Sequence, residues 1–145
     1  MQDLSSLDNA LAYRIVRAAR LLRVSLMHTL EPFDLGPEQY FVLFRLHERD
    51  GRSQGELVDP VLGDRANISR LVAGLETRGL VARRPNPADG RVRLVHLTLD
   101  GKALLDRVLK LVPAERQRLF GELTDEETSA LQRALTLIER QTRAG

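Results

Sequence analysis

Residues 64–97 read DRANISRLVAGLETRGLVARRPNPADGRVRLVHL, and the spacing of their apolar residues changes partway along. In the first half, apolar residues recur every three or four positions, which predicts a helix with one buried stripe. Asp64 is placed to cap this helix and Gly79 to end it. Two short β-prone runs follow, at 80–84 and 92–97, on either side of a turn-forming tip. The stretch therefore predicts a helix followed by a hairpin with a long tip.

A long helix is predicted near the start of the chain. Its apolar residues form one stripe at helical spacing, namely Leu11, Ile15, Ala18, Leu22, Leu26 and Leu30. Asp8 is placed to cap this helix and Pro32 to stop it. Because the stripe runs from end to end, we expect the helix to need an apolar partner along its whole length.

Two shorter helices are predicted between this helix and residue 64. Gly36-Pro37 opens the first of them, with proline in the first turn. Ser53 and Glu56 form a capping box that begins the second, and Pro60 should keep that helix short. Three helices followed by a hairpin are typical of a winged helix-turn-helix.

The chain returns to helix after Thr98. Pro113 is expected to kink or interrupt this part. Thr124 and Glu127 form a second capping box, which begins the last helix. The expected fold is mainly α with a small β-hairpin wing.

The chain divides on this basis into three regions. We expect an N-terminal dimerisation helix in residues 1–35, a winged helix-turn-helix module in residues 36–98, and C-terminal dimerisation helices in residues 99–145. The outer regions would form one structural unit, because their apolar residues are buried most simply against each other and against a second copy of the chain. The alternative to this homodimer is that both outer regions fold back on their own subunit.

The charge of the chain is unevenly distributed. The 145 residues include 22 Lys and Arg and 20 Asp and Glu, so the net charge of +2 makes no case for a nucleic-acid partner. Residues 65–93 hold seven arginines and only Glu76 and Asp89 as acids, which gives this segment a charge of +5. Such a segment is expected to contact phosphates, and Arg83 and Arg84 are candidates for these contacts. The alternative is a solvated basic surface.

Composition disfavours several classes of protein. The absence of cysteine excludes disulfides, thiolate zinc sites and thiol-based redox sensing. Aromatic residues make up 4% and Trp is absent, which disfavours a base-stacking platform for single strands. No apolar run approaches the roughly 20 residues that cross a bilayer, and the N-terminus does not resemble a signal peptide. We therefore expect a soluble, cytoplasmic protein with no membrane partner.

A catalytic or metal site is not expected either. His28, His47 and His96 fall on separate predicted elements and have no partner at ligand spacing. The sequence also lacks a Ser-His-Asp arrangement and a glycine-rich phosphate loop. We predict no catalytic residue, no metal and no cofactor.

The helix that begins at residue 65 is a candidate for reading DNA. Its exposed N-terminal half should present Arg65, Ala66, Asn67, Ser69 and Arg70. In a major groove, arginine bonds guanine and asparagine bonds adenine, while small residues let the backbone approach. The alternative for each residue is an ordinary polar helix face. The capped helix before it and the hairpin after it favour DNA reading.

The hairpin tip supplies a second candidate contact. Asp89 can pair with Arg91 and hold the arginine extended toward a minor groove, whose negative potential attracts arginine. Such Asp-x-Arg pairs are also common in ordinary turns. At the start of the third helix, Ser53 and Gln54 could bond phosphates together with exposed backbone N–H groups.

Residues 53–101 resemble the core of the MarR family of winged-helix transcription regulators. The similarity is carried by NISRLV at 67–72, LETRGLVAR at 75–83, DGR at 89–91 and LTLDG at 97–101. It implies a homodimer that binds a pseudo-palindromic operator in double-stranded DNA, with the helix from residue 65 in the major groove and Arg91 in the flanking minor groove. Pro60 within the third helix and Gly55 in its first turn depart from the family pattern.

The resemblance also implies a small-molecule effector. Many members of the family release DNA when a small aromatic acid binds between the dimerisation helices and the winged module. The candidate effector-binding residues are Tyr13, Arg17, Tyr40, Phe41 and His47. Arg17 would pair with a carboxylate of the effector. The alternative, which we prefer, is core packing with Arg17 solvated.

These observations predict a homodimeric, sequence-specific regulator that binds double-stranded DNA, most simply a repressor. An alternative from another class is a winged-helix protein-interaction module without DNA binding. In that case, changing Arg70 or Arg91 would alter no DNA affinity. A small enzyme is a further alternative, which the missing catalytic arrangements disfavour.

Overall fold

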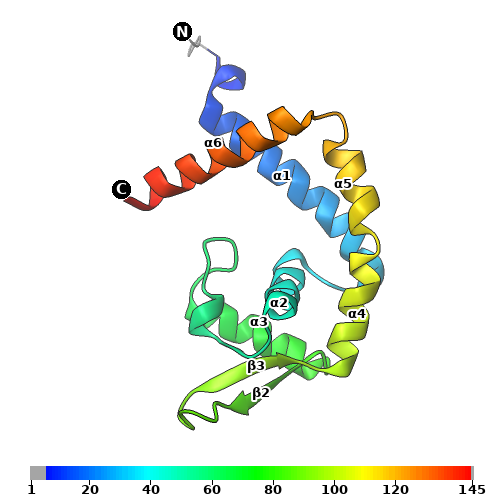
Figure 1. Cartoon of the computed structure of the whole chain (residues 1–145), viewed down its shortest axis with the longest axis vertical. Helices are drawn as coiled ribbons and strands as arrows, with labels where there is room; N and C mark the ends of the chain where they lie inside the picture. The colour runs from blue at the N-terminus through cyan, green and yellow to red at the C-terminus, as the bar shows by residue number, and fades with distance from the viewer. Residues whose placement is uncertain (1–5, 145) are drawn as a thin grey trace. The chain divides into compact units, whose positions relative to one another are not determined.

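The chain is mostly helical and carries one small sheet, as predicted (Figure 1). The computed structural model describes residues 6–144. Its α-helices are α1 (Leu11–Leu30), α2 (Pro37–Glu48), α3 (Arg65–Thr77), α4 (Leu99–Leu109), α5 (Val112–Phe120) and α6 (Asp125–Ala144). Single 3-10 turns lie at Leu7–Asn9, Glu31–Phe33 and Gly55–Leu57. The described residues up to Val108 form one compact unit, and those from Leu109 form a second.

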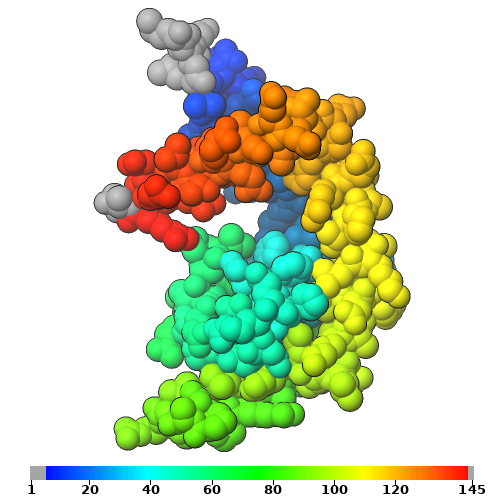
Figure 2. Space-filling model, viewed as in Figure 1, coloured from blue at the N-terminus to red at the C-terminus, as the bar shows by residue number. Residues whose placement is uncertain are grey.

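The sheet has three antiparallel strands in the order β1–β3–β2. β2 (Val81–Pro85) and β3 (Arg93–Leu97) form the predicted hairpin, and we call residues 81–97 the wing. The wing lies below α3 in Figure 1, and the space-filling view shows it open to solvent (Figure 2). β1 (Arg52–Ser53) adds to the free edge of β3. This strand is not predicted, because two residues carry no detectable periodicity.

A buried apolar core is shared by α2, α3, α4 and the wing. Its least accessible residues include Val42, Leu43, Leu46, Ile68, Val72, Leu75, Val81, Val95 and Leu105. The predicted stripe of α3 therefore faces the core, and its polar face is left for other contacts. α3 ends as predicted before Gly79, which has a φ of +72°, and the Leu80 N–H donates to the Leu75 carbonyl at 3.0 Å.

The start of α4 lies directly against the start of the wing. The Thr98 N–H donates to the Leu80 carbonyl at 3.1 Å, and the Gly101 N–H donates to Thr98 Oγ1 at 3.0 Å. A Cβ at position 101 would lie 2.0 Å from the Leu80 carbonyl oxygen, so only glycine permits this approach. The contact fixes the position of the wing against α4.

The predicted cap of the first helix is wrong. α1 begins at Leu11, with Ala10 at its N-cap and no side-chain cap. Asp8 lies in the preceding 3-10 turn, where its carboxylate accepts a hydrogen bond from Arg17 Nη1 at 3.2 Å. The ion pair with Arg17 uses the carboxylate that the prediction assigned to the helix end.

The predicted third helix is much shorter than expected. Only the 3-10 turn Gly55–Leu57 forms, although the capping box between Ser53 and Glu56 is present, with both hydrogen bonds at 3.2 Å. Pro60 lies beyond this turn, in the loop before α3, and not within a helix. Glycine at the first position and proline soon after leave too few helix-forming residues for a longer element.

The two long helices expose most of their apolar residues. On α1, the exposed residues of the predicted stripe include Leu11, Ile15 and Leu22, and only Leu30 is fully buried. On α6, the large apolar residues Leu131, Leu137 and Ile138 are exposed. Each helix, taken by itself, keeps apolar surface open to a partner.

The second unit confirms two predictions about helix ends. Pro113 lies in the first turn of α5, so the helical segment is interrupted between Leu109 and Val112. The capping box between Thr124 and Glu127 is present, with both hydrogen bonds at 3.1 Å.

Candidate nucleic-acid interface

α3 presents most of the residues predicted to read DNA. Asp64 is its N-cap, and the Asp64 carboxylate accepts a hydrogen bond from the Asn67 N–H at 2.9 Å. The exposed residues of the first turns are Arg65, Ala66 and Arg70, and Ser69 is half-buried. The stripe on the opposite side is in the core, so this half of α3 offers a polar, basic surface of the size that fits a major groove.

The Asn67 side chain has two partners within the protein. Its Nδ2 donates to the Leu62 carbonyl at 2.6 Å, and its Oδ1 accepts from Arg70 Nη2 at 3.2 Å. Gly63, with a φ of +93°, packs against the amide, since a Cβ there would lie 3.0 Å from Nδ2. Asn67 thus holds the turn before α3 and orients Arg70. Contact with an adenine would require the amide to leave these partners.

The tip of the wing is a turn that short side chains hold together. The Asn86 N–H donates to the Val92 carbonyl at 2.8 Å, and Asp89 Oδ1 accepts from the Arg91 N–H at 3.1 Å. Asp89 therefore fixes the backbone at Arg91, and its carboxylate forms no ion pair with the Arg91 guanidinium in the described structure. The Arg91 side chain is exposed.

The corner between β1 and the turn at 55–57 supplies Ser53 and Gln54. Ser53 pairs with Leu94 of β3, which holds the corner beside the wing. Ser53 also makes both bonds of the capping box with Glu56. The Oε1 atom of Gln54 is buried and lacks a hydrogen-bond partner.

The corner, α3 and the wing meet around one cavity, which we call the arginine hollow. It has a volume of about 290 Å³ and is lined by Ser53, Gln54, Arg65, Arg83, Arg91, Val92, Arg93 and Val95. Five of these residues are predicted DNA contacts, and the structure brings them together from separate parts of the chain. The other predicted contacts on α3, as well as Arg84 and Asp89, lie outside the hollow.

Arg93 also lines the arginine hollow, although it is not among the predicted contacts. Strand alternation carries the signal that could have found it. Arg93 and Val95 are two residues apart in β3, so they share one face of this strand. Arg83 pairs opposite Val95 and therefore lies on the same face of the wing.

The arginine hollow lacks acidic partners. None of its four arginines forms an ion pair with a described Asp or Glu, whereas Arg23 and Arg49 elsewhere in the chain do. Glu56, at the corner beside the hollow, bonds the Ser53 N–H and the Arg49 side chain, and these bonds hold the pKa of its carboxyl below the usual range. The hollow therefore keeps its positive charge.

The candidate effector residues lie on α1 and α2. The Arg17 guanidinium lies 5.5 Å from the centre of the Tyr13 ring and pairs with Asp8. The rings of Tyr40 and Phe41 have centres 5.5 Å apart, and burial raises the pKa of the Tyr40 hydroxyl. Phe41 lines a cavity of about 400 Å³, and the ring of His47, an exposed residue, lies 5.9 Å from that of Phe44.

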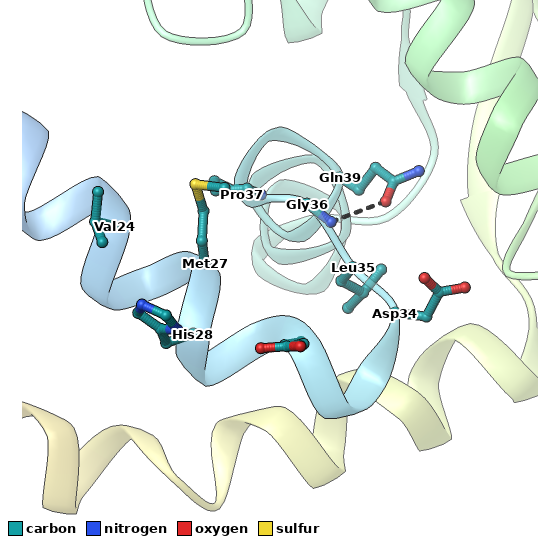
Figure 3. Close-up of a pocket in the computed structure, with 9 residues that line it drawn as sticks. Val24, Met27, His28, Asp34, Leu35, Gly36, Pro37 and Gln39 are labelled. Carbon is teal, nitrogen blue, oxygen red and sulfur yellow. Dashed lines mark hydrogen bonds between the residues drawn. The ribbon is translucent and has the colours of Figure 1, made fainter.

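A further cavity of about 450 Å³ lies where α1 and α2 meet (Figure 3). Its lining residues are Val24, Met27, His28, Glu31, Asp34, Leu35, Gly36, Pro37 and Gln39. Figure 3 shows Met27 of α1 pointing toward Pro37 at the start of α2. The volume lies within the range of small-molecule sites. The sequence does not single out these residues, because such a mixture of apolar and polar positions is typical of any turn between two helices.

Membrane and metal sites find no support in residues 6–144. No described helix has the length and apolar character needed to span a bilayer. No three His, Asp or Glu side chains in this range are placed to hold a metal ion.

The fold and the arginine hollow define a winged helix-turn-helix protein with a basic surface suited to nucleic acid. Residues 33–92 match the MarR family. The transcriptional regulator HosA of Escherichia coli O111:H- is 32% identical over 94 residues, which are 65% of this chain and 70% of HosA. The chain belongs to the MarR family.

Two solved structures extend the similarity to nearly the whole chain. CouR from Rhodococcus jostii RHA1, bound to p-coumaroyl-CoA, is 27% identical with a TM-score of 0.85, over 92% of this chain and 94% of CouR. The transcriptional repressor CouR bound to a 23-mer DNA duplex is 31% identical with a TM-score of 0.84, over 96% of this chain and 99% of that one. The predicted winged-helix fold is confirmed.

Proposed function

We propose that the chain is a homodimeric transcriptional repressor that binds a pseudo-palindromic site in double-stranded DNA. α3 of each protomer enters a major groove, and Arg91 of each wing enters the flanking minor groove. The arginine hollow carries this proposal, because it brings the start of α3, the β1 corner and the wing to one surface without acidic partners. The regulator HosA and the DNA-bound repressor CouR support it.

We assign the protein no catalytic activity, since the relatives named above are transcriptional regulators. Its place of action is the compartment that holds the DNA, which we take to be the cytoplasm. Residues 36–98 form the DNA-binding module in this proposal, and residues 1–35 and 99–145 form the dimerisation region.

The exposed apolar residues of α1 and α6 support the homodimer. Deleting residues 124–145 removes α6, so we expect the truncated chain to sediment as a monomer while the full chain sediments as a dimer. Circular dichroism serves as the control that the remaining helices are folded. A folded truncated chain that still forms a stable dimer would overturn this assignment.

The proposed effector is a small aromatic acid or its acyl thioester. CouR, a relative of similar fold, was solved with p-coumaroyl-CoA. The predicted residues Tyr13, Arg17, Tyr40, Phe41 and His47 remain candidates for its site, and the cavity between α1 and α2 is a second candidate of suitable size. The test measures release of DNA by the compound from the wild type and from variants substituted at each candidate site. The site whose substitution reduces this release is the effector site.

Fluorescence anisotropy tests the DNA-binding function. The first duplex is the DNA upstream of the protein's own gene, and a scrambled duplex of equal length is its control. We expect saturable binding in the nanomolar range that falls steeply with salt and resists non-specific competitor. If binding is weak and competitor removes it, a selection from random duplexes follows. A selection that enriches no sequence would favour the interaction module without DNA binding.

A further inference from the structure

We propose that Arg78 is a positioning residue, whose guanidinium ties the end of α3 to the turn between α1 and α2. We call residues 31–36 the α1–α2 turn. By holding α3 to this turn, Arg78 sets the separation at which the two protomers read their half-sites. This role rests on the proposed function, because it concerns how α3 is presented to DNA. Arg78 itself contacts neither a base nor a phosphate in this proposal.

The hydrogen bonds of Arg78 are the first observation. Its Nη1 donates to the Asp34 carbonyl at 2.5 Å, and its Nη2 donates to the Phe33 carbonyl at 3.2 Å. Arg78 is the C-cap of α3 and is exposed, so a surface side chain joins segments 44 and 45 positions apart in the sequence. A guanidinium can bond two acceptors at once, because its donors lie in one rigid plane.

The two carbonyls lie at the end of a helical segment, where backbone oxygens lack partners within the helix. The 3-10 turn Glu31–Phe33 continues α1, and Asp34 ends it with a φ of +53°. This left-handed conformation is unfavourable for a residue other than glycine. Arg78 supplies donors to this segment, and a cation is favoured there because the carbonyl ends of helices are negative. Its bonds therefore stabilise the shape of the turn as well as its place beside α3.

A second contact joins α3 to the segment around the turn. Gln39, in the first turn of α2, accepts a hydrogen bond from the Gly36 N–H at 3.0 Å (Figure 3). Its side chain also lies beside Gly74 of α3, where a Cβ would come within 3.9 Å of Gln39 Nε2. Gly74 and Arg78 are about one helical turn apart. The last turn of α3 therefore meets this segment at two places.

The α1–α2 turn is also held by α4. The Arg107 guanidinium lies 5.3 Å from the centre of the Phe33 ring, and Leu30, the last residue of α1, is fully buried. The turn is thus a junction of α1, α3 and α4. Because α1 belongs to the proposed dimerisation region, a swing of α3 relative to this turn would move it relative to the α3 of the partner. A two-fold operator requires a fixed separation, since its half-sites lie about 34–36 Å apart.

The first arm of the test measures the position of α3 without DNA. Arg20 of α1 and Ala66 of α3 are exposed, and the chain has no cysteine, so Arg20→Cys and Ala66→Cys can carry two spin labels. An excess of unlabelled chain leaves one labelled protomer in each dimer, and double electron–electron resonance gives the distance between the labels. We expect Arg78→Ala to broaden the distribution of this distance.

Thr77→Ala is the matched control for this arm. Thr77 is the exposed neighbour of Arg78, and its hydroxyl donates to the Ala73 carbonyl at 2.9 Å, within α3 itself. Its loss removes a side chain at the same end of the helix without touching the α1–α2 turn. We expect the label distances to stay as they are in the parent protein. Circular dichroism of every variant checks that the fold is kept.

The second arm measures binding to operators whose half-site spacing is lengthened or shortened by single base pairs. Wild type should bind one spacing best, because a rigid dimer fits one separation. We expect Arg78→Ala to bind that duplex about fivefold more weakly, since α3 is less preorganised, and to lose most of the difference between spacings. Preference for bases within each half-site should remain, and Thr77→Ala should behave as wild type.

Arg78→Lys separates geometry from charge. Lysine keeps the positive charge and loses the planar pair of donors, so we expect it to resemble Arg78→Ala in both arms. A different result would overturn the proposal: Arg78→Ala weakens binding by one common factor at every spacing, and Arg78→Lys restores it. Arg78 would then act through its charge near DNA.

The two arms also separate this role from the proposed function. An unchanged distance distribution in Arg78→Ala overturns the tie between α3 and the turn, while the repressor function stands. A broadened distribution with an unchanged preference for spacing overturns the link between the tie and the half-site separation. If the wild type selects no DNA, the proposed function fails, and the first arm alone decides whether Arg78 holds α3 to the turn.

Discussion

Two regions of this chain are rich in arginine and differ in the partners that they provide. Where α1 meets α2, Arg23 makes two hydrogen bonds to the Glu38 carboxylate, at 2.5 and 3.1 Å. Across α3 and the wing, no arginine in residues 65–93 forms an ion pair with a described acid. The difference separates Arg23, whose charge a carboxylate already neutralises, from the arginines of residues 65–93, whose charge no described carboxylate neutralises.

Replacing Arg70 should have the largest effect on DNA recognition. Arg70→Ala removes an exposed guanidinium of α3, so we expect a loss of about 1–3 kcal/mol in operator binding and a relaxed base preference. Arg23→Ala is the matched control, because it removes an arginine that already has an acidic partner, and it should leave affinity within about twofold. Anisotropy on a panel of single-base variants measures both. Equal losses on every duplex would show that Arg70 contacts only the backbone.

Sequence alone predicts the elements that carry this contrast. The change of apolar spacing at Gly79 correctly separates α3 from the wing, because helical and strand periods differ over many residues. The capping boxes at Ser53 and Thr124 are also found, since their partners lie three residues away. Patterns that depend on near neighbours are readable in the sequence.

Features that depend on distant residues are not readable in this way. β1 is a strand only because Ser53 pairs with Leu94, about forty positions further along. Arg93 joins the arginine hollow as the first residue of β3, where it pairs with Pro85 of β2. Asn67 is a different case: it is expected at base edges, and its partners Leu62 and Arg70 lie within five positions, but their bonds to the amide form only once the turn before α3 has folded. The contacts of the folded chain decide these roles, so local propensity cannot.

A carboxylate placed beside Arg70 would give this α3 arginine an acidic partner, like the partner that Arg23 has. Asn67→Asp loses the donor to the Leu62 carbonyl and gives Arg70 an ionised acceptor at the same place. We expect about tenfold weaker DNA binding, because Arg70 becomes paired and one negative charge is added near phosphate. Asn67→Ala is the control that loses both bonds without adding charge. Anisotropy that shows wild-type affinity for Asn67→Asp would mean that pairing does not decide the role of Arg70.

The wing arginine should have a smaller and more local effect. Arg91→Ala leaves the turn intact, since Asp89 bonds the backbone N–H at this position and not the side chain. We expect about a fivefold loss of operator affinity. The variant should also lose its preference for particular sequences in the operator flanks, where Arg91 would lie in the minor groove. Footprinting with wild type and variant measures this loss. An unchanged footprint together with unchanged affinity would refute the minor-groove contact.

The stability contributed by the Arg23–Glu38 pair, where α1 meets α2, should depend on pH, and DNA binding should not depend on this pair. Hydrogen bonds from Arg23 hold the pKa of the Glu38 carboxyl below its usual range. A lowered pKa in the folded state stabilises the protein above the unfolded value of about 4.3, and this contribution is lost as pH falls through the folded pKa. Since the Arg23 side chain is about half exposed (47%), the contribution is no more than about 1 kcal/mol.

Glu38→Gln tests this sign directly. The carboxamide cannot ionise, so we expect wild type to exceed the variant in urea stability at about pH 7 and the two to converge below about pH 4. Operator affinity at neutral pH should be equal in both proteins. A stability difference that persists unchanged in acid would mean that Glu38 acts through packing, and its ion pair with Arg23 would then no longer mark a structural region. A fall in operator affinity would instead place Glu38 within the binding region, and this result would contradict the distinction between the two arginine-rich regions.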